Sequence, residues 1–393
     1  MEALLLLIAL TAVFGVLVAP ALRRRRLRKE AEGGMRQTLD PSSGYGFVPP
    51  QELDVRLPGP DPELLEALEE TQRTQDWGPV ARMLALTSDE WELRWQRVQS
   101  LAGAAAMELS QARAGGLDTA DATSGEAPGG PSLSKEPRPR DARWLRNWRA
   151  QQPGDAGGAQ VYAQFLVWQA VADPASEDHR IVLEEARNIC RDAAALDPRD
   201  PTPHITELFV ARYLGYRTAD FESLWSEVRR RAPHHMGAHL VALPYWSQQD
   251  SGAKERADAF ARTAAAQAPE GTLLPALPLF ATYAHLPEVN MVRGLYQSAE
   301  IETAIEAAEF AVDQVEDGHP VRPHVLHLLV CFLVRAERYR EAMEALSVVD
   351  GYVGALPWAD SADPATEYAG YRALAVAGWE ATGGSRAQQP PTS

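Results

Sequence analysis

Five histidines are the residues of this sequence whose type and spacing could support chemistry. His234, His235 and His239 form one cluster, and His324 and His327 stand three residues apart, where they would share one face of a helix. Three or four such ligands would have to converge to bind a metal ion. An enzyme with a histidine metal site on a helical scaffold is therefore one hypothesis.

The position of the histidines within a repeat favours a different role. His204, His239 and His324 stand at the same place in three copies of a repeated pattern, at the start of its first helix. A residue that recurs at one repeat position usually serves packing between repeats. We therefore assign these histidines to packing and predict no metal ligand.

Motifs that would carry catalysis are missing from the sequence. It contains no Gly-rich phosphate loop, no Gly-x-Ser-x-Gly elbow and no His-Glu-x-x-His. Cys190 and Cys331 have no second cysteine at metal or redox spacing, and both are typical of small core residues. We predict no catalytic residue and no cofactor.

Two further groups could bind ligands but have a simpler explanation. Trp144 and Trp148, like Trp91 and Trp95, are four residues apart, which is typical of a buried helix face rather than an aromatic cage. The run Arg229–Arg231 ends a predicted helix, where cations interact favourably with the helix dipole. Binding of an acidic partner is the alternative for these arginines.

The elements that position these residues follow one repeated pattern. Apolar or small residues recur at i, i+3, i+4 and i+7, which is one face of an α-helix, and a proline or glycine follows each stripe and ends the helix. Copies about 35 residues apart predict stacked helical pairs. The stripes begin at Ala186, Phe221, Ala257 and Tyr339.

The first helices of the pairs align as well, through Ile205, Leu240 and Val325. Pro244 falls inside one of them and should kink or shorten it. Residues 271–294 carry three prolines and break the period, which predicts an irregular turn or a short helix pair.

These helical pairs resemble the tetratricopeptide class. The best stretch is His324–Asp350, in which Tyr339-Arg340-Glu341-Ala342 opens a second helix after a short turn. The resemblance implies an α-solenoid.

A closer resemblance is to a bacterial helical-repeat domain of unknown function. Ala195–Pro198, Leu243-Pro244-Tyr245-Trp246 and Phe260-Ala261 carry it, and it spans about residues 143–283. It implies the fold and no chemistry.

Charge and hydropathy point to a membrane anchor. Residues 3–22 are apolar apart from Thr11, and twenty helical residues span about 30 Å, the thickness of a bilayer core. The basic run Arg23–Lys29 follows, so the positive-inside rule predicts that the N-terminus lies outside and the main domain in the cytoplasm. A cleaved or exported form is the alternative. The whole chain carries a net charge of −16, which argues against nucleic-acid binding by the main domain.

The sequence thus predicts an all-α protein with an N-terminal transmembrane helix and a tetratricopeptide-like α-solenoid. The predicted order is a transmembrane signal anchor (1–22), a basic flank and flexible linker (23–60), a small helical module (61–114), a disordered loop (115–140), the repeat array (141–381) and a disordered tail (382–393).

The expected function is that of a single-pass scaffold or adaptor at the cell membrane, which binds a protein or peptide at the cytoplasmic face. We expect Tyr213, Tyr245 and Trp246 on the inner helices to contact that partner. The alternatives are the metal enzyme and a structural membrane component that self-associates. The oligomeric state and the partner's identity do not follow from the sequence.

Overall fold

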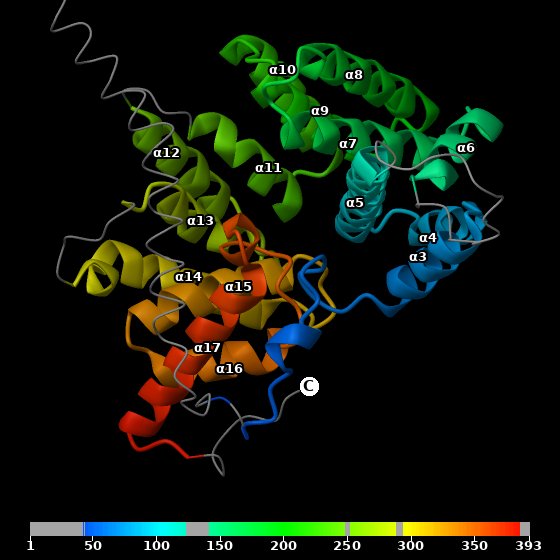
Figure 1. The fold of residues 1–393 in the computed structure, drawn as a ribbon. Coiled ribbons are helices and arrows are strands. Elements are labelled where there is room, and N and C mark those ends of the chain that lie inside the picture. The colour runs from blue at the N-terminus through cyan, green and yellow to red at the C-terminus, as the bar shows by residue number, and fades with distance from the viewer. Residues whose placement is uncertain (1–41, 43, 123–140, 248–251, 288–293, 386–393) are drawn as a thin grey trace, which may run out of the picture. The chain divides into compact units, whose positions relative to one another are not determined.

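All regular elements that the structure describes are helices (Figure 1). The computed structural model describes residues 42, 44–122, 141–247, 252–287 and 294–385, and within 114–122 only the backbone. The chain divides after Gly46, and every helix named below belongs to the second unit, Phe47–Ser393. The predicted all-α class is therefore confirmed for the described residues.

Three α-helices precede the repeat array. In the first, Pro62 occupies the first helical position and the carboxylate of Asp61 accepts a hydrogen bond from the Leu64 N–H at 3.0 Å, which caps the helix. A short 3₁₀ element, η2 (Pro50–Glu52), lies before them. The helices are α3 (Pro62–Thr74), α4 (Gly78–Thr87) and α5 (Trp91–Ala122).

The helix α5 is longer than expected. We predicted that the helical module ends near Ala114 and that a loop follows over residues 115–140, but α5 continues to Ala122. No proline interrupts α5, so nothing in its backbone forces an earlier end. The remainder of the predicted loop, 123–140, lies outside the described residues.

The array begins with α6 at Arg143 and ends with α17 at Ala381. Its helices are α6 (Arg143–Gln151), α7 (Ala156–Ala172), α8 (His179–Leu196), α9 (Thr202–Tyr213), α10 (Thr218–Arg231), α11 (Met236–Trp246), α12 (Ala253–Ala266), α13 (Leu277–Ala284), α14 (Ala299–Gln314), α15 (Arg322–Arg335), α16 (Tyr339–Val349) and α17 (Pro364–Ala381), with the 3₁₀ turns η3 (Leu274–Ala276), η4 (Leu295–Gln297) and η5 (Trp358–Asp360).

The helices of residues 91–284 form two layers. Helices α5, α7, α9, α11 and α13 contact one another in series, and α8, α10 and α12 pack against them. Helices α7 and α9 are therefore covered by neighbours, and most of their residues are buried. Helices α8, α10 and α12 each bury only one stripe of residues. These stripes are the predicted ones, since Ala186, Phe221 and Ala257 are fully buried.

The interruption of the repeat is also where the sequence predicts it. Residues 274–284 form the 3₁₀ turn η3 and the short helix α13, and regular helices resume with α14. Pro244 lies inside α11, which has eleven residues. Both features follow from proline, which cannot donate a helix hydrogen bond.

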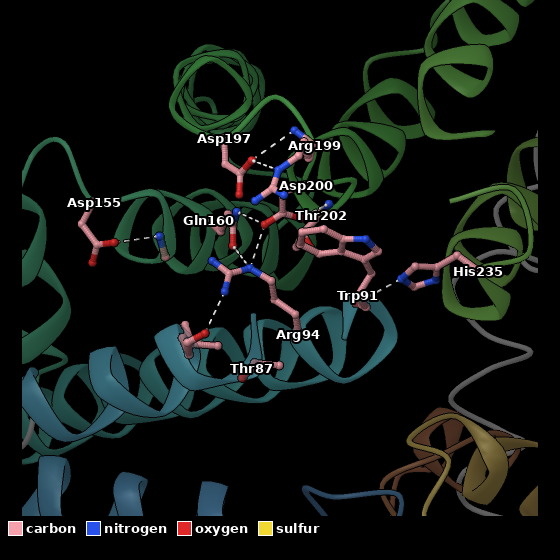
Figure 2. A network of polar contacts seen from close by, with 12 residues as sticks. Thr87, Trp91, Arg94, Asp155, Gln160, Asp197, Arg199, Asp200, Thr202 and His235 are labelled. Atoms are coloured by element: carbon pink, nitrogen blue, oxygen red, sulfur yellow. Dashed lines mark hydrogen bonds and ion pairs between the residues drawn. The ribbon is translucent and has the colours of Figure 1, made fainter. Parts of the chain in front are cut away.

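A buried polar network ties α5 to the array (Figure 2). The Arg94 guanidinium of α5 donates to the Asp200 carboxylate at 2.7 Å and to the Gln160 side chain of α7 at 3.1 Å. Gln160 also donates to Asp200 at 2.6 Å, and Asp200 caps α9 by accepting from the Thr202 N–H at 2.7 Å. Asp200 and Gln160 are fully buried, so the network fixes three helices relative to one another.

Residues 47–60 are packed against the C-terminal helices, which corrects the prediction that they are a flexible linker. Leu53 and Leu57 are buried, and the Pro58 carbonyl accepts from His327 of α15 at 2.8 Å. The segment has no periodic apolar face because irregular backbone, rather than a helix, makes the contacts.

The middle of α17 packs over the same segment. The Arg372 guanidinium donates to the Val48 carbonyl at 2.7 Å and to the Asp350 carboxylate at 2.9 Å. Arg372 is almost fully buried, so its charge depends on Asp350 for compensation.

The predicted transmembrane helix and basic flank, residues 1–29, lie outside the described residues, as does the end of the tail, 386–393. In the part of the chain that is described, no helix is both long enough and apolar enough to cross a bilayer.

Candidate functional site

A groove of about 330 Å³ lies on the array where α10, α11 and α12 meet. Trp225 and Arg229 of α10, His239 and Trp246 of α11, and Phe260 of α12 line it. Helix α11 belongs to the layer of α5, α7, α9, α11 and α13, whereas α10 and α12 belong to the other layer. The groove therefore opens between α10 and α12, with α11 as its inner wall.

The start of α11 is held by α5, and this sets the position of the groove's inner wall. The His235 Nδ1 accepts from the Ala238 N–H at 3.0 Å, which caps α11, and its Nε2 donates to the Trp91 carbonyl at 3.2 Å (Figure 2). The Glu92 carboxylate accepts from the Met236 N–H. These bonds connect α11 to α5, so α11 cannot shift without breaking them.

Gly237 allows α5 and α11 to approach closely. A Cβ atom at this position would lie 2.6 Å from the Trp95 ring, so only glycine fits against the indole. Trp95 is buried and also contacts the ring of His324, with ring centroids 6.4 Å apart. The predicted core role of this tryptophan is confirmed.

Helix α12 supplies the outer wall of the groove. Its buried stripe consists of alanines, which lets it lie close to its neighbours. A second row lies beside that stripe and lines the groove, at spacings of four, three and four residues. Its members are Arg256, Phe260, Thr263 and Gln267.

Aromatic rings form the wall of the groove. Trp225 and Phe260 meet at 5.5 Å between centroids and an interplanar angle of 60°, and Trp225 meets His239 edge-on at 4.8 Å. Trp246 lies 6.2 Å from Phe260. The indole N–H of Trp246 is buried and has no hydrogen-bond acceptor among the described residues.

The charge of the groove comes from arginines. Burial, together with the nearby Arg229, lowers the pKa of His239 to about 4, so His239 is neutral at pH 7. Arg229 and Arg256 line the groove, and the described residues of the lining include no carboxylate. The lining is therefore cationic, although the chain as a whole is acidic.

The arginine run of α10 divides between two roles. Arg230 and Arg231 both bond the Glu227 carboxylate, at 2.8 and 2.7 Å, and hold the pKa of Glu227 down at about 2. Arg231 also donates to the Pro198 carbonyl of the preceding repeat at 2.8 Å. Arg229 is exposed on the other side of α10 and lines the groove.

The three residues that we expected to contact a partner are not together. Trp246 lines the groove. Tyr245 lies behind it, buried, stacked on Phe221 at 3.7 Å and donating its hydroxyl to the Tyr216 carbonyl at 2.8 Å. Tyr213 is half-buried at the end of α9, against His179.

Of the five histidines considered as metal ligands, His235, His239 and His327 are buried, His324 is half-buried and His234 is exposed. His204, His239 and His324 lie in the first turns of α9, α11 and α15, as predicted, and His239 bonds the His235 carbonyl. His327 accepts from the Trp358 indole N–H at 3.0 Å.

Among the described residues, no three His, Cys, Asp or Glu side chains converge as metal ligands would. Both cysteines are buried and free.

Sequence reasoning missed Trp225, Arg256 and Phe260 as groove residues. Trp225 and Phe260 belong to the predicted stripes, so they were expected to be buried core. The signal that could have separated them is size, because the other stripe positions of α12 are alanines and a phenylalanine there must lie at the edge.

Comparison with protein-family models, with curated proteins and with solved structures gave no significant match to this chain.

Proposed function

We propose that this protein is a helical-repeat scaffold that binds a segment of a partner protein in the groove of α10, α11 and α12. The carrying observation is that the groove combines aromatic walls with arginine, and that no carboxylate is among the described residues that line it. Aromatic residues and arginine are the types that dominate binding energy at protein interfaces. In the described part of the array, the charged side chains of the buried networks are instead satisfied within the fold.

The stacked helices support this proposal because they hold the groove rigid. The polar contacts of His235 and Glu92 fix α11, and the alanine stripe of α12 packs it closely against its neighbours. A groove that is formed before the partner arrives loses little conformational entropy on binding.

The membrane anchor remains part of the proposal. The apolar run of residues 3–22 and the basic run Arg23–Lys29 support a scaffold that is tethered to the membrane with its array at the cytoplasmic face. Such a tether would raise the local concentration of the partner at the membrane.

Affinity capture with the full chain from its native cells tests the binding function. We expect a discrete partner protein to be recovered with the wild type and lost with Trp246→Ala. The matched control is Trp379→Ala, which removes a half-buried tryptophan of α17 that does not line the groove. The proposal would be contradicted if both variants recovered the partner equally well, or if the wild type recovered no discrete partner protein.

A further inference from the structure

The size of the groove suggests that it holds one side chain of the partner. Its volume of about 330 Å³ is near the lower end of ligand pockets, which range over roughly 300–1,000 Å³. An extended segment of several residues would not fit inside it, whereas one large side chain would, with its neighbours lying over the rim.

The walls favour a flat aromatic guest. Trp225, Trp246 and Phe260 present rings whose mutual angles are 60° and 31° rather than one flat stack. Aromatic rings prefer offset and edge-to-face contacts at centroid distances of about 4.5–7 Å, and this arrangement can add a further ring in the same way.

The rim favours carboxylates beside that ring. Arg229 of α10 is exposed at the rim, and the neutral His239 of α11 adds no charge to the lining. A guanidinium forms strong, directional hydrogen bonds with a carboxylate. The hydroxyl of Thr263 and the amide of Gln267 add uncharged polar groups to the same lining.

A nucleic-acid strand would also match arginine and aromatic rings, but the rest of the chain argues against it. The net charge of −16 repels a long polyanion. One or two carboxylates on a short segment experience mainly the local arginines, because physiological salt screens exposed charges beyond about 8 Å.

We propose that the groove recognises an acidic segment of a partner protein through one aromatic anchor, which packs against the rings of Trp246 and Phe260, and through a flanking carboxylate, which pairs with Arg229. This inference rests on the proposed function and names the chemistry of the partner.

Fluorescence anisotropy with matched probes tests the inference on the purified full chain in mild detergent. The probes are fluorescein-labelled nonapeptides with a central phenylalanine flanked on both sides by two Glu, two Gln or two Lys residues. A Glu-flanked peptide with a central alanine and an eight-nucleotide thymidine strand complete the set.

We expect the Glu-flanked phenylalanine peptide to bind about three- to fivefold more tightly than its Gln-flanked form, since one exposed pair contributes about 0.2–1 kcal/mol. Replacement of the anchor by alanine should weaken binding about 30-fold or more. Arg229→Gln should abolish most of the preference for Glu over Gln and leave the thermal melting curve unchanged.

Several results would overturn the inference: tighter binding of the Gln- or Lys-flanked peptide, equal binding of the alanine peptide, tighter binding of the thymidine strand, or no binding of any peptide. A Gln- or Lys-flanked peptide that binds the wild type but not Trp246→Ala would leave the proposed function intact. If no peptide binds, the capture experiment with Trp246→Ala and Trp379→Ala decides the proposed function separately.

Discussion

Arginine, tryptophan and histidine occur together in two regions of this molecule, the network around Arg94 and the groove beside Arg229. In the first region the Arg94 guanidinium is buried and contacts the fully buried Asp200 carboxylate at 2.7 Å. In the second, Arg229 is exposed on the rim of the groove, and the lining residues that the structure describes include no carboxylate.

The difference shows how to separate structural from functional candidates when residue types alone do not. A buried charge must find its partner inside the fold, because leaving it unpaired costs several kcal/mol. An exposed arginine on an aromatic wall bears no such cost and keeps its donors for a ligand. Each prediction below perturbs one region and leaves the other unchanged.

The largest expected effect comes from breaking the buried network. Asp200→Asn removes the charge that Arg94 requires, so the free energy of unfolding in urea should fall by about 3–5 kcal/mol. Asp220→Asn is the matched control, because its pair with Arg217 is exposed, and it should leave the stability unchanged. Similar losses for the two variants would remove the distinction between buried and exposed pairs.

The second effect is a pH dependence of stability that arises at the contact of α5 with α11. Burial raises the pKa of Glu92 to about 8, against hydrogen bonds from the Met236 and Gly237 N–H groups. Because the folded pKa is raised, the native state favours the protonated acid, and this stability is lost as the pH rises from about 4.5 to about 8.

Glu92→Gln should therefore gain stability relative to the wild type across that pH range, by on the order of a few kcal/mol at its upper end. Urea unfolding at pH 5, 6, 7 and 8 measures the difference. Glu227→Gln is the control, because the pKa of Glu227 is lowered to about 2 and this carboxylate stays charged over the whole range. The difference in unfolding free energy between Glu227→Gln and the wild type should therefore not change with pH. A constant difference for Glu92→Gln as well would refute the assignment.

The third effect concerns binding. Trp246→Ala should weaken binding of the Glu-flanked phenylalanine peptide by about 30-fold, or about 2 kcal/mol, because an aromatic side chain that lines the groove is lost. Asp200→Asn, assayed below its unfolding temperature, should retain the affinity of the wild type. A loss of affinity in both variants would mean that the network and the groove are not separable.

The smallest effect is expected at the rim. Arg229→Gln should weaken binding of the same peptide about three- to fivefold and should make the affinity less dependent on salt. The reason is that one exposed pair between Arg229 and a peptide carboxylate is removed. Arg230→Gln is the control, because Arg230 pairs with Glu227 and does not line the groove. If both variants weaken binding equally, a diffuse positive field rather than Arg229 itself accounts for the affinity.

Local pattern predicted the helices well. The stripes that begin at Ala186, Phe221 and Ala257 are buried, and the Asp61–Pro62 start of α3 is capped. Helical periodicity and capping depend on residues a few positions apart, so they can be recognised in one sequence.

Long-range pairing could not be predicted in this way. Arg94 and Asp200 are 106 positions apart, and the pairing of the segment 47–60 with α15 spans 269 positions at Pro58 and His327. Neither pairing leaves a periodic signal. For the same reason the sequence could not tell Arg229 from Arg230 and Arg231, which differ only in the side of α10 that they occupy.

The residues that the sequence analysis expects to contact a partner lie in different surroundings. Trp246 lines the groove, but Tyr245, the adjacent residue, points its hydroxyl to the Tyr216 carbonyl and is buried. Adjacent residues of a helix differ in direction by about 100°, so repeat phase alone cannot decide which of the two is accessible.

Site-specific photocrosslinking in the native cells tests the central claim most directly. A photoreactive phenylalanine analogue would replace Thr263, which is exposed and lines the groove, or Arg262, which is exposed on the same helix and does not line it. The account predicts one discrete protein adduct from position 263, abolished by Trp246→Ala, and none from position 262. Equal adducts from both positions, or an adduct at position 263 that persists in Trp246→Ala, would contradict the claim that this groove is where the partner binds.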